Sequence, residues 1–379
     1  MNLVLAFFLI LGAFPAAASG IPESIIRVGV LEKAGSANIG AEGKFALFEL
    51  NTGRKLAYSG KDILLVKADS RGILISGKVL ASPVRASSLE KGKFLRLNGR
   101  RYRDSLIIRK EKEGNVTVIN ELGIDGYLYG ILPREIGPDW PEESLKAQAV
   151  VSRTFALRNL SRHESAGYNL CARDHCQVYG GLDGEAPETN RAVDATHHAV
   201  LAWKGSLANT FFFANCGGRT ADPADAWEGS ESIPYLRSVR CRFCRNGRHF
   251  RWDAVVDERT LLQSFDRAGV GIERPIRSIK TSGTTHSGRA ASVVIRHAGG
   301  EVRLRAGRFR MIAGPAVVRS TMISGVRRTK GGFYFFGKGW GHGVGLCQEG
   351  AKSLAGRGTG YEDILDFYYP GTVLSVLED

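Results

Sequence analysis

Outside its N-terminus the sequence lacks any apolar run of the roughly 20 residues that a membrane-spanning helix requires, so we expect no integral membrane span in the mature chain. It also lacks internal repeats, heptad patterns and low-complexity tracts. These absences exclude collagen-like and disordered proteins. With 379 residues, of which 43% are hydrophobic, the chain can form a sizeable core. Its length predicts about two or three domains.

The sequence has fewer acidic than basic residues: 38 Asp and Glu and 52 Lys and Arg give a net charge of +14. The basic residues form no Lys/Arg block and no stripe interleaved with aromatics, so we find no nucleic-acid-binding module. A basic protein outside the cytoplasmic membrane meets anionic polymers: wall glycan bearing carboxylates, lipid head groups or stray nucleic acid. If the chain is exported, its charge favours such a polymer as the partner.

Residues 1–20 form the one strongly apolar segment. It is apolar from Leu3 to Phe14 and ends on small residues of the A-x-A type at Pro15 to Ala18. This pattern is typical of a secretory signal peptide, which predicts an extracytoplasmic location, secreted, periplasmic or in the cell-wall space. The segment has no Lys or Arg, so an N-terminal anchor or a buried helix is the alternative.

Hydrophobic periodicity predicts an α+β protein. Short runs that alternate apolar and polar residues predict a β-rich region from residue 22 to about 122. A helix is expected from Pro141 to about Arg162, with Asp139 or Trp140 as N-cap and Pro141 at the first helical position. Further β-rich stretches are expected at 199–239 and 279–336, with helices near 258–268, 348–355 and 361–369.

Glu135 is our candidate catalytic acid. Pro133 and Gly137 bound its segment, which predicts a turn among apolar and aromatic neighbours just before a helix. Burial disfavours the charged form of a carboxyl and raises its pKa, and a general acid for glycosidic-bond cleavage must be protonated near neutral pH. The alternative is a structural carboxylate that pairs with Arg134 or caps the helix.

Two cations accompany Glu135 on the following helix. Lys146 and Arg153 are seven residues apart and therefore share one helical face. They could hold an anionic sugar substituent near Glu135. Two cations at this spacing are otherwise a solvated stripe.

A cluster of thiols and imidazoles follows that helix. His163, Cys171, His175 and Cys176 are the ligand types of tetrahedral zinc, although their spacing is not that of a standard finger. Exported cysteines also form disulfides, and a Cys171–Cys176 bridge is the competing interpretation. We favour zinc at Cys171, His175 and Cys176, because a disulfide has no need of the adjoining imidazole. His163 is the candidate fourth ligand.

The remaining four cysteines form a second group. They are Cys216, the CxxC pair Cys241 and Cys244, and Cys347. They could form an all-cysteine metal site or two disulfides, and their spacing does not decide between these.

A glycine-rich segment near the C-terminus has glycine at every second position from Gly337 to Gly345, with His342 between them and Gln348 shortly after. Such a backbone can approach a ligand closely. The pattern is neither G-x-G-x-x-G nor a Walker loop, so a nucleotide-binding fold is not supported. His342 and Gln348 are therefore candidate site residues.

Four segments, in order, resemble the SpoIID/LytB family of stage II sporulation proteins and amidase enhancers. They read YLYGILPREIGPDWPEESLKAQAVVSRTFAL, HCQVYGG, FFFANCGGRTADPADAWEG and GWGHGVGLCQEGAKSLAGRGTGYEDILDFYYPGT, and the resemblance covers about residues 110–376. It implies an extracytoplasmic cell-wall protein, since the sporulation members act as lytic transglycosylases on peptidoglycan glycan strands. The four cysteines of the second group depart from the sporulation pattern.

The resemblance places the family's catalytic acid on Glu135, its helix cations on Lys146 and Arg153, and its zinc cluster on the His163 to Cys176 region. Lys146, Arg153, His342 and Gln348 would orient the glycan, and zinc would be structural, because four protein ligands leave no open position. The layout that we expect is a signal peptide at 1–20, a β-rich lobe at 21–109 and a SpoIID/LytB-like region at 110–379 with a central cleft.

A lone carboxylate suits a lytic transglycosylase, because glycoside hydrolases normally need two. The partners would be peptidoglycan glycan strands. One alternative is a non-enzymatic amidase enhancer that binds peptidoglycan or a wall amidase. Another is a zinc-dependent wall peptidase or amidase.

Overall fold

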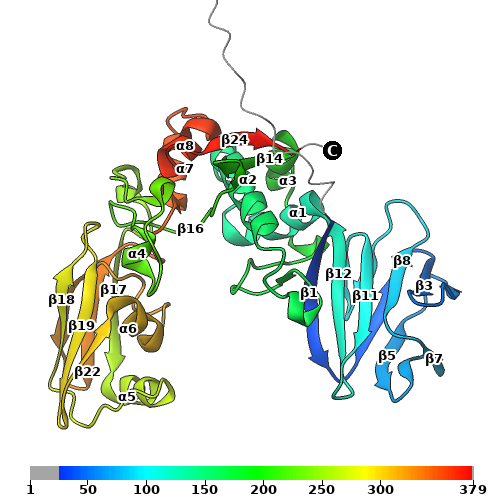
Figure 1. Cartoon of the computed structure of the whole chain (residues 1–379), viewed down its shortest axis with the longest axis horizontal. Helices are drawn as coiled ribbons and strands as arrows, with labels where there is room; N and C mark the ends of the chain where they lie inside the picture. Colours follow the sequence, from blue (N-terminus) through cyan, green and yellow to red (C-terminus); the bar gives the residue numbers. More distant parts are fainter. Residues whose placement is uncertain (1–24, 378–379) are drawn as a thin grey trace, which may run out of the picture.

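The computed structural model describes residues 25–377, which form an arch (Figure 1). Two β-rich limbs stand apart, one from each half of the chain, and helices join them at the top. The mixed α+β fold is therefore confirmed. The predicted signal peptide at 1–20 lies outside the described residues. Within 25–377, no helix is both long and apolar enough to cross a membrane.

The N-terminal limb consists of two sheets, which confirms the predicted β-rich region. Side chains alternate along its strands: in β5, Leu64 and Val66 are buried, whereas Leu65 and Lys67 are exposed. The inward-facing side chains of both sheets belong to one core. The seven-stranded sheet has the order β13-β1-β12-β11-β8-β3-β4; its strands are β1 (Ile25–Ala34), β3 (Phe45–Glu49), β4 (Lys55–Tyr58), β8 (Val84–Ser88), β11 (Ser105–Lys110), β12 (Val116–Gly123) and β13 (Leu170–Cys171).

The six-stranded sheet has the order β10-β9-β2-β5-β6-β7. Its strands are β2 (Ala37–Ala41), β5 (Leu64–Asp69), β6 (Gly72–Ile75), β7 (Lys78–Leu80), β9 (Leu95–Leu97) and β10 (Arg100–Tyr102). The expected boundary between the β-rich lobe and the following region, between residues 109 and 110, falls inside β11. Strand β11 pairs with β12 along its whole length.

Helix α1 (Ile124–Glu135) follows β12 directly, and α2 (Glu142–Arg158) begins seven residues after it ends. The structure thus corrects the expected turn at Glu135, which is instead the last residue of α1. The sequence signal for this helix is the spacing of its apolar residues, which are all buried on one face: Ile124, Tyr127, Leu128, Ile131 and Leu132.

The α2 prediction is confirmed with small changes: Pro141 occupies the N-cap and the helix ends at Arg158. The additional helix α3 (Pro187–Ala195) packs against both α1 and α2. The helices therefore form a compact group above the N-terminal limb (Figure 1).

The top of the arch also contains short paired strands. These are β14 (Ala199–Trp203), β15 (Ser206–Leu207) and β24 (Val373–Val376) in one sheet, and the parallel pair β16 (Phe212–Phe213) and β23 (Leu346–Cys347). The stretch 199–239 is less β-rich than expected, since α4 (Pro223–Ala226) and irregular backbone follow β16. Helices α7 (Gln348–Ala355) and α8 (Tyr361–Tyr368) lie where the sequence predicts them.

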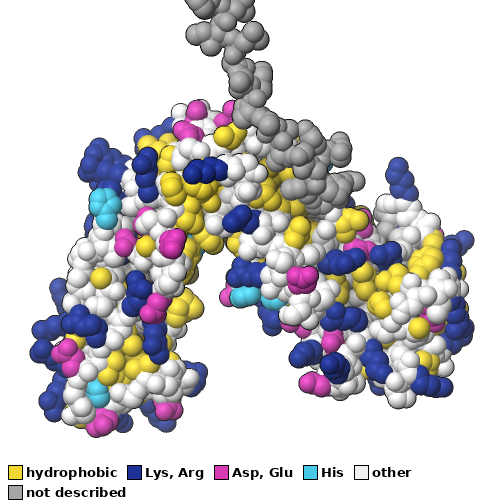
Figure 2. All heavy atoms as spheres, viewed as in Figure 1, with side chains coloured by type: hydrophobic (Ala, Val, Ile, Leu, Met, Phe, Trp, Pro, Cys, Tyr) yellow, Lys and Arg dark blue, Asp and Glu magenta, His cyan; other side chains and the backbone are white. Residues whose placement is uncertain are grey.

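The C-terminal limb has its own core between two three-stranded sheets and two helices. The sheets contain β17 (Arg251–Asp257), β21 (Ile323–Arg328) and β22 (Gly332–Lys338), and β18 (Ser278–Thr284), β19 (Ala290–His297) and β20 (Gly300–Arg305); the helices are the expected α5 (Glu258–Arg267) and the additional α6 (Ala306–Ala313). Lys and Arg side chains are spread over both limbs (Figure 2).

Candidate functional site

Glu135 ends α1 with its side chain half-buried. Its Oε1 accepts a hydrogen bond of 3.4 Å from the backbone N–H of Val178. Within residues 25–377 no ion pair joins it to Arg134, whose guanidinium lies beside Gly180. The alternative that Glu135 is a structural carboxylate paired with Arg134 therefore has no support.

Burial raises the pKa of Glu135 above its ordinary value of 4.5, and the Val178 hydrogen bond only partly opposes this. Among the described residues, no neighbouring charge contributes to the shift. The position at the C-terminal, negative end of α1 also disfavours the ionised carboxyl. The direction of the shift agrees with the prediction for a general acid.

Gln348 connects the late glycine-rich segment to Glu135. Its Nε2 donates to the backbone carbonyl of Glu135 at 3.3 Å and lies 3.4 Å from Oε1 of Gln148 on α2. Gln148 is not among the residues predicted for the site, and it in turn donates to Ser152 at 3.1 Å. The start of α7 is thereby held against both α1 and α2.

Lys146 lies on α2 with 18% of its side chain exposed. Its Nζ is 2.9 Å from Glu142 and 2.8 Å from Glu143, and these carboxylates raise its pKa, Glu143 most. Glu143 also accepts the backbone N–H of Tyr361 at 2.7 Å. Lys146 therefore belongs to a contact between α2 and α8.

Arg153 is completely buried, which contradicts its predicted contact with substrate. Its guanidinium pairs with Asp125 at 2.9 Å and donates to the carbonyls of Ala199 at 3.0 Å and Val193 at 3.3 Å. The heptad spacing does place it on the face of Lys146, but α1, α3 and β14 cover that part of α2. Arg153 is a scaffold residue that joins these elements.

The hydrogen-bond partners of His342 differ from those of Glu135. Its Nε2 donates to the carbonyl of Phe212 at 3.0 Å, and its Nδ1 accepts from Val344 at 3.1 Å, an assignment that the neutral ring allows. Burial lowers the pKa of His342 to about 3, so the ring is neutral. It lines a hollow of about 250 Å³ with Trp227 and residues of α6, and Glu135 is not among the lining residues. The part of the chain that the structure describes does not show the predicted central cleft.

The alternating glycines serve close approach within the chain itself. Gly343 and Gly345 have positive φ angles of 94° and 80°. A Cβ on Gly345 would lie 2.1 Å from the carbonyl oxygen of Phe211, and one on Gly343 would lie 2.4 Å from Arg289. Glycine is therefore required here for packing.

The first Cys/His cluster assembles as the sequence predicts. The ligand atoms of His163, Cys171, His175 and Cys176 all lie within 4.8 Å of one another. The sulfur of Cys176 is 3.3 Å from Nε2 of His163 and 3.7 Å from Nδ1 of His175, close to the roughly 3.5 Å expected between ligands of one tetrahedral zinc. The donor set thus fits zinc, and zinc binding stays a prediction.

The position of this cluster links it to Glu135. Strand β13 pairs in parallel with β1 and so places Cys171 at the sheet edge, opposite Gly29. Cys176 lies two residues before Val178, whose N–H contacts Glu135. A metal here would hold the loop that supplies this contact.

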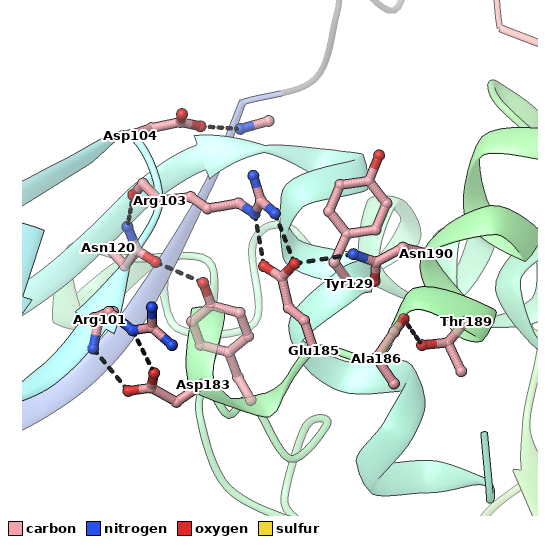
Figure 3. Close-up of polar contacts among 12 residues, drawn as sticks. Arg101, Arg103, Asp104, Asn120, Tyr129, Asp183, Glu185, Ala186, Thr189 and Asn190 are labelled. Atoms are coloured by element: carbon pink, nitrogen blue, oxygen red, sulfur yellow. Dashed lines mark hydrogen bonds and ion pairs between the residues drawn. The ribbon is translucent and has the colours of Figure 1, made fainter. Parts of the chain in front are cut away.

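A polar network, not found from the sequence, anchors the next part of the same loop (Figure 3). Both oxygens of Glu185 accept from Arg103 at 2.6 Å, and Asp183 accepts from Arg101 at 2.7 Å. The hydroxyl of Tyr179 donates to Asn120 at 2.6 Å. The N-terminal limb thereby fixes the backbone that passes α1, where Gly180 donates to the carbonyl of Gly130 at 3.0 Å.

The second cysteine group also assembles. The sulfurs of Cys216, Cys241, Cys244 and Cys347 lie within 4.8 Å of one another, and all four residues are buried. The sequence predicts that these cysteines form a group but does not choose between a metal site and disulfides. The fold brings their four sulfurs together.

Comparisons with known proteins match these regions. The family model described as stage II sporulation protein matches residues 112–203, which include α1, α2 and the first Cys/His cluster. A domain of unknown function matches residues 243–345, which include the C-terminal limb.

Individual proteins are similar over longer stretches of the chain. An uncharacterized protein of Brachyspira hyodysenteriae is 34% identical over 73% of this chain and 72% of its own length. The amidase enhancer of Bacillus subtilis is 27% identical over 76% of this chain and 49% of its own length. Stage II sporulation protein D of Bacillus subtilis is 25% identical over 68% of this chain and 76% of its own length.

Proposed function

The chain belongs to the SpoIID/LytB family and has a cell-wall related role, and on that premise we propose that it is a lytic transglycosylase. It would cleave peptidoglycan glycan strands outside the cytoplasmic membrane and leave 1,6-anhydromuramyl ends. The observation that carries this proposal is the half-buried carboxyl of Glu135, whose pKa is raised by burial and by no neighbouring charge in the described chain.

A single carboxyl can perform both proton transfers of this reaction. Protonated Glu135 donates its proton to the glycosidic oxygen as the C1–O bond to the leaving sugar breaks. The resulting carboxylate then takes the proton of the muramyl C6 hydroxyl as that oxygen bonds to C1. Glu135 ends in its initial state and no water is consumed. The closure is intramolecular, so its orientation is set in advance.

The surroundings of Glu135 suit this role. Val178 hydrogen-bonds one carboxyl oxygen, while Gln348 holds the backbone at the end of α1. Gln348 is therefore a positioning residue in this proposal, and Lys146 is the predicted sugar contact on α2 that retains exposure. His163, Cys171, His175 and Cys176 would hold a zinc that supplies a structural cross-link, because four protein ligands leave no position for water.

A second candidate is a non-enzymatic amidase enhancer, favoured by the similarity to the Bacillus subtilis protein of that name. In this case the chain would bind glycan, or a wall amidase, and stimulate that enzyme. The two candidates differ in whether this chain breaks a glycosidic bond.

Digestion of peptide-free glycan strands by the purified protein, with mass spectrometry of the products, separates these candidates. We expect products with anhydro ends. Ends heavier by one water would instead identify a hydrolase. Uncleaved strands, together with stimulation of an added wall amidase, would identify an enhancer and contradict the proposal.

The pH dependence of cleavage follows from the raised pKa. Only the protonated carboxyl of Glu135 can start the reaction, so kcat/KM should be highest at low pH and fall as the pH rises through a value above 4.5. Circular dichroism over the same range controls for unfolding. A rate that instead increases with pH would show that the carboxylate form starts the reaction, against the acid role.

A further inference from the structure

Four cysteines from three separate parts of the chain meet in the core of the arch top. Cys216 follows β16, Cys241 and Cys244 flank the start of a 3-10 turn at Phe243–Asn246, and Cys347 ends β23. All are buried free thiols whose sulfurs lie within 4.8 Å of one another. They share no residue with the cluster around His163.

The spacing of these sulfurs fits one metal ion. Zinc–sulfur bonds of about 2.3 Å put the sulfurs of a tetrahedral site about 3.8 Å apart. The sulfurs of Cys216 and Cys244 are 3.3 Å apart, well beyond the roughly 2.05 Å of a disulfide. The CxxC pair in a tight turn is the ligand spacing of structural zinc sites. A cluster of several irons would hold four cysteine sulfurs further apart than one ion does.

Hydrogen-bond donors point at the sulfurs. The backbone N–H of Cys216 donates to the sulfur of Cys347 at 3.2 Å, and that of Gly218 to Cys216 at 3.4 Å. The hydroxyl of Tyr368 is 3.3 Å from the sulfur of Cys241. Such donors stabilise the negative charge of metal-bound thiolates.

A buried cation beside the cluster has no carboxylate ion pair within residues 25–377. Arg289 is 1% exposed, donates to the carbonyls of Cys216 at 3.0 Å and Arg219 at 3.1 Å, and has an Nε without a hydrogen-bond partner. A buried charge needs an opposite charge. Four thiolates around one divalent ion carry a net charge of −2, which would supply the negative charge that Arg289 lacks, whereas two disulfides carry none.

We propose that Cys216, Cys241, Cys244 and Cys347 bind a single zinc ion as a structural tetrathiolate site. Binding releases the four thiol protons to solvent and forms four Zn–S bonds. The ion would cross-link the segment after β16, the turn at Phe243 and the end of β23. Since Gln348 directly follows Cys347, the site would also fix the residue that contacts Glu135.

Metal analysis of the full-length protein tests this site independently of glycan cleavage. We expect two zinc ions per chain, one for each cluster. The Cys171→Ser/Cys176→Ser variant should retain one zinc, whose X-ray absorption spectrum shows four sulfurs at about 2.3 Å. Cys241→Ser/Cys244→Ser should also retain one, with two sulfurs and two nitrogens.

Wild-type protein provides a test that does not depend on the folding of variants. With both sites filled, the average zinc has three sulfur neighbours and one nitrogen neighbour; with the first site alone it has two of each. In denaturant with chelator, all six cysteines should react with iodoacetamide. Reaction of only two, an average of two sulfurs per zinc, or iron in place of zinc would overturn the proposal.

Discussion

Glu135→Gln should lower the rate of glycan cleavage by at least about 100-fold, the lower end of what a general acid–base contributes. Glutamine keeps the shape of the side chain and can still accept the N–H of Val178. It has no proton to donate at the pH of the assay. Strand binding should therefore persist while release of anhydro products stops, as measured by co-sedimentation with glycan and by mass spectrometry.

The same variant should be as stable as the wild type or more stable. Because burial disfavours the carboxylate and raises the pKa of Glu135 in the folded state, the folded protein loses stability as the pH rises above the ordinary pKa, and the loss is complete above the raised pKa. The neutral amide removes this penalty at pH 7. Glu113→Gln, in an exposed turn, is the matched control and should retain full activity. Undiminished cleavage by Glu135→Gln would refute the catalytic role.

Arg153→Ala should lower the free energy of unfolding by about 3 kcal/mol or more, since it leaves a partner of a buried ion pair without its charge. Asp125 would lose the guanidinium and keep its contact with His197. The carbonyls of Val193 and Ala199 would each lose a donor. Urea unfolding followed by circular dichroism measures the change.

Lys146→Ala on the same helix is the control for this prediction. Lys146 pairs with two carboxylates at the protein surface, where such pairs contribute about 0–1 kcal/mol. We therefore expect a small change in stability. If Arg153→Ala instead unfolds like the wild type but no longer binds glycan, the sugar contact predicted from the sequence is right and the scaffold role is wrong.

Helix α1 shows that local sequence signals can conflict in predicting secondary structure. Pro133 and Gly137 predict the bounds of a turn, yet the five buried apolar residues of α1 have helical spacing. Pro133 lies inside this helix, which continues for two residues beyond it to Glu135. Helices α7 and α8 were predicted correctly, since each is amphipathic and ends at a glycine or Pro-Gly signal.

Lys146 and Arg153 on α2 show that spacing along a helix does not determine which side chains are buried. A separation of seven residues places Lys146 and Arg153 on one face, but it does not say which neighbour covers that face. In the structure, α1, α3 and β14 enclose Arg153, whereas Lys146 stays near the surface beside α8. One becomes a scaffold residue and the other remains a candidate contact.

The sequence by itself determined the residue types and the local groupings: a lone carboxyl beside a helix start, two thiols and two imidazoles within one loop, and the secondary structure of the last two helices. These follow from neighbours a few positions apart. Only the tertiary structure decided that Gln348 contacts the backbone of Glu135, that His342 contacts the carbonyl of Phe212, and that Cys347 meets Cys216 across 131 positions. Such contacts depend on how sheets and helices pack, and periodicity within one segment carries no information about its distant partner.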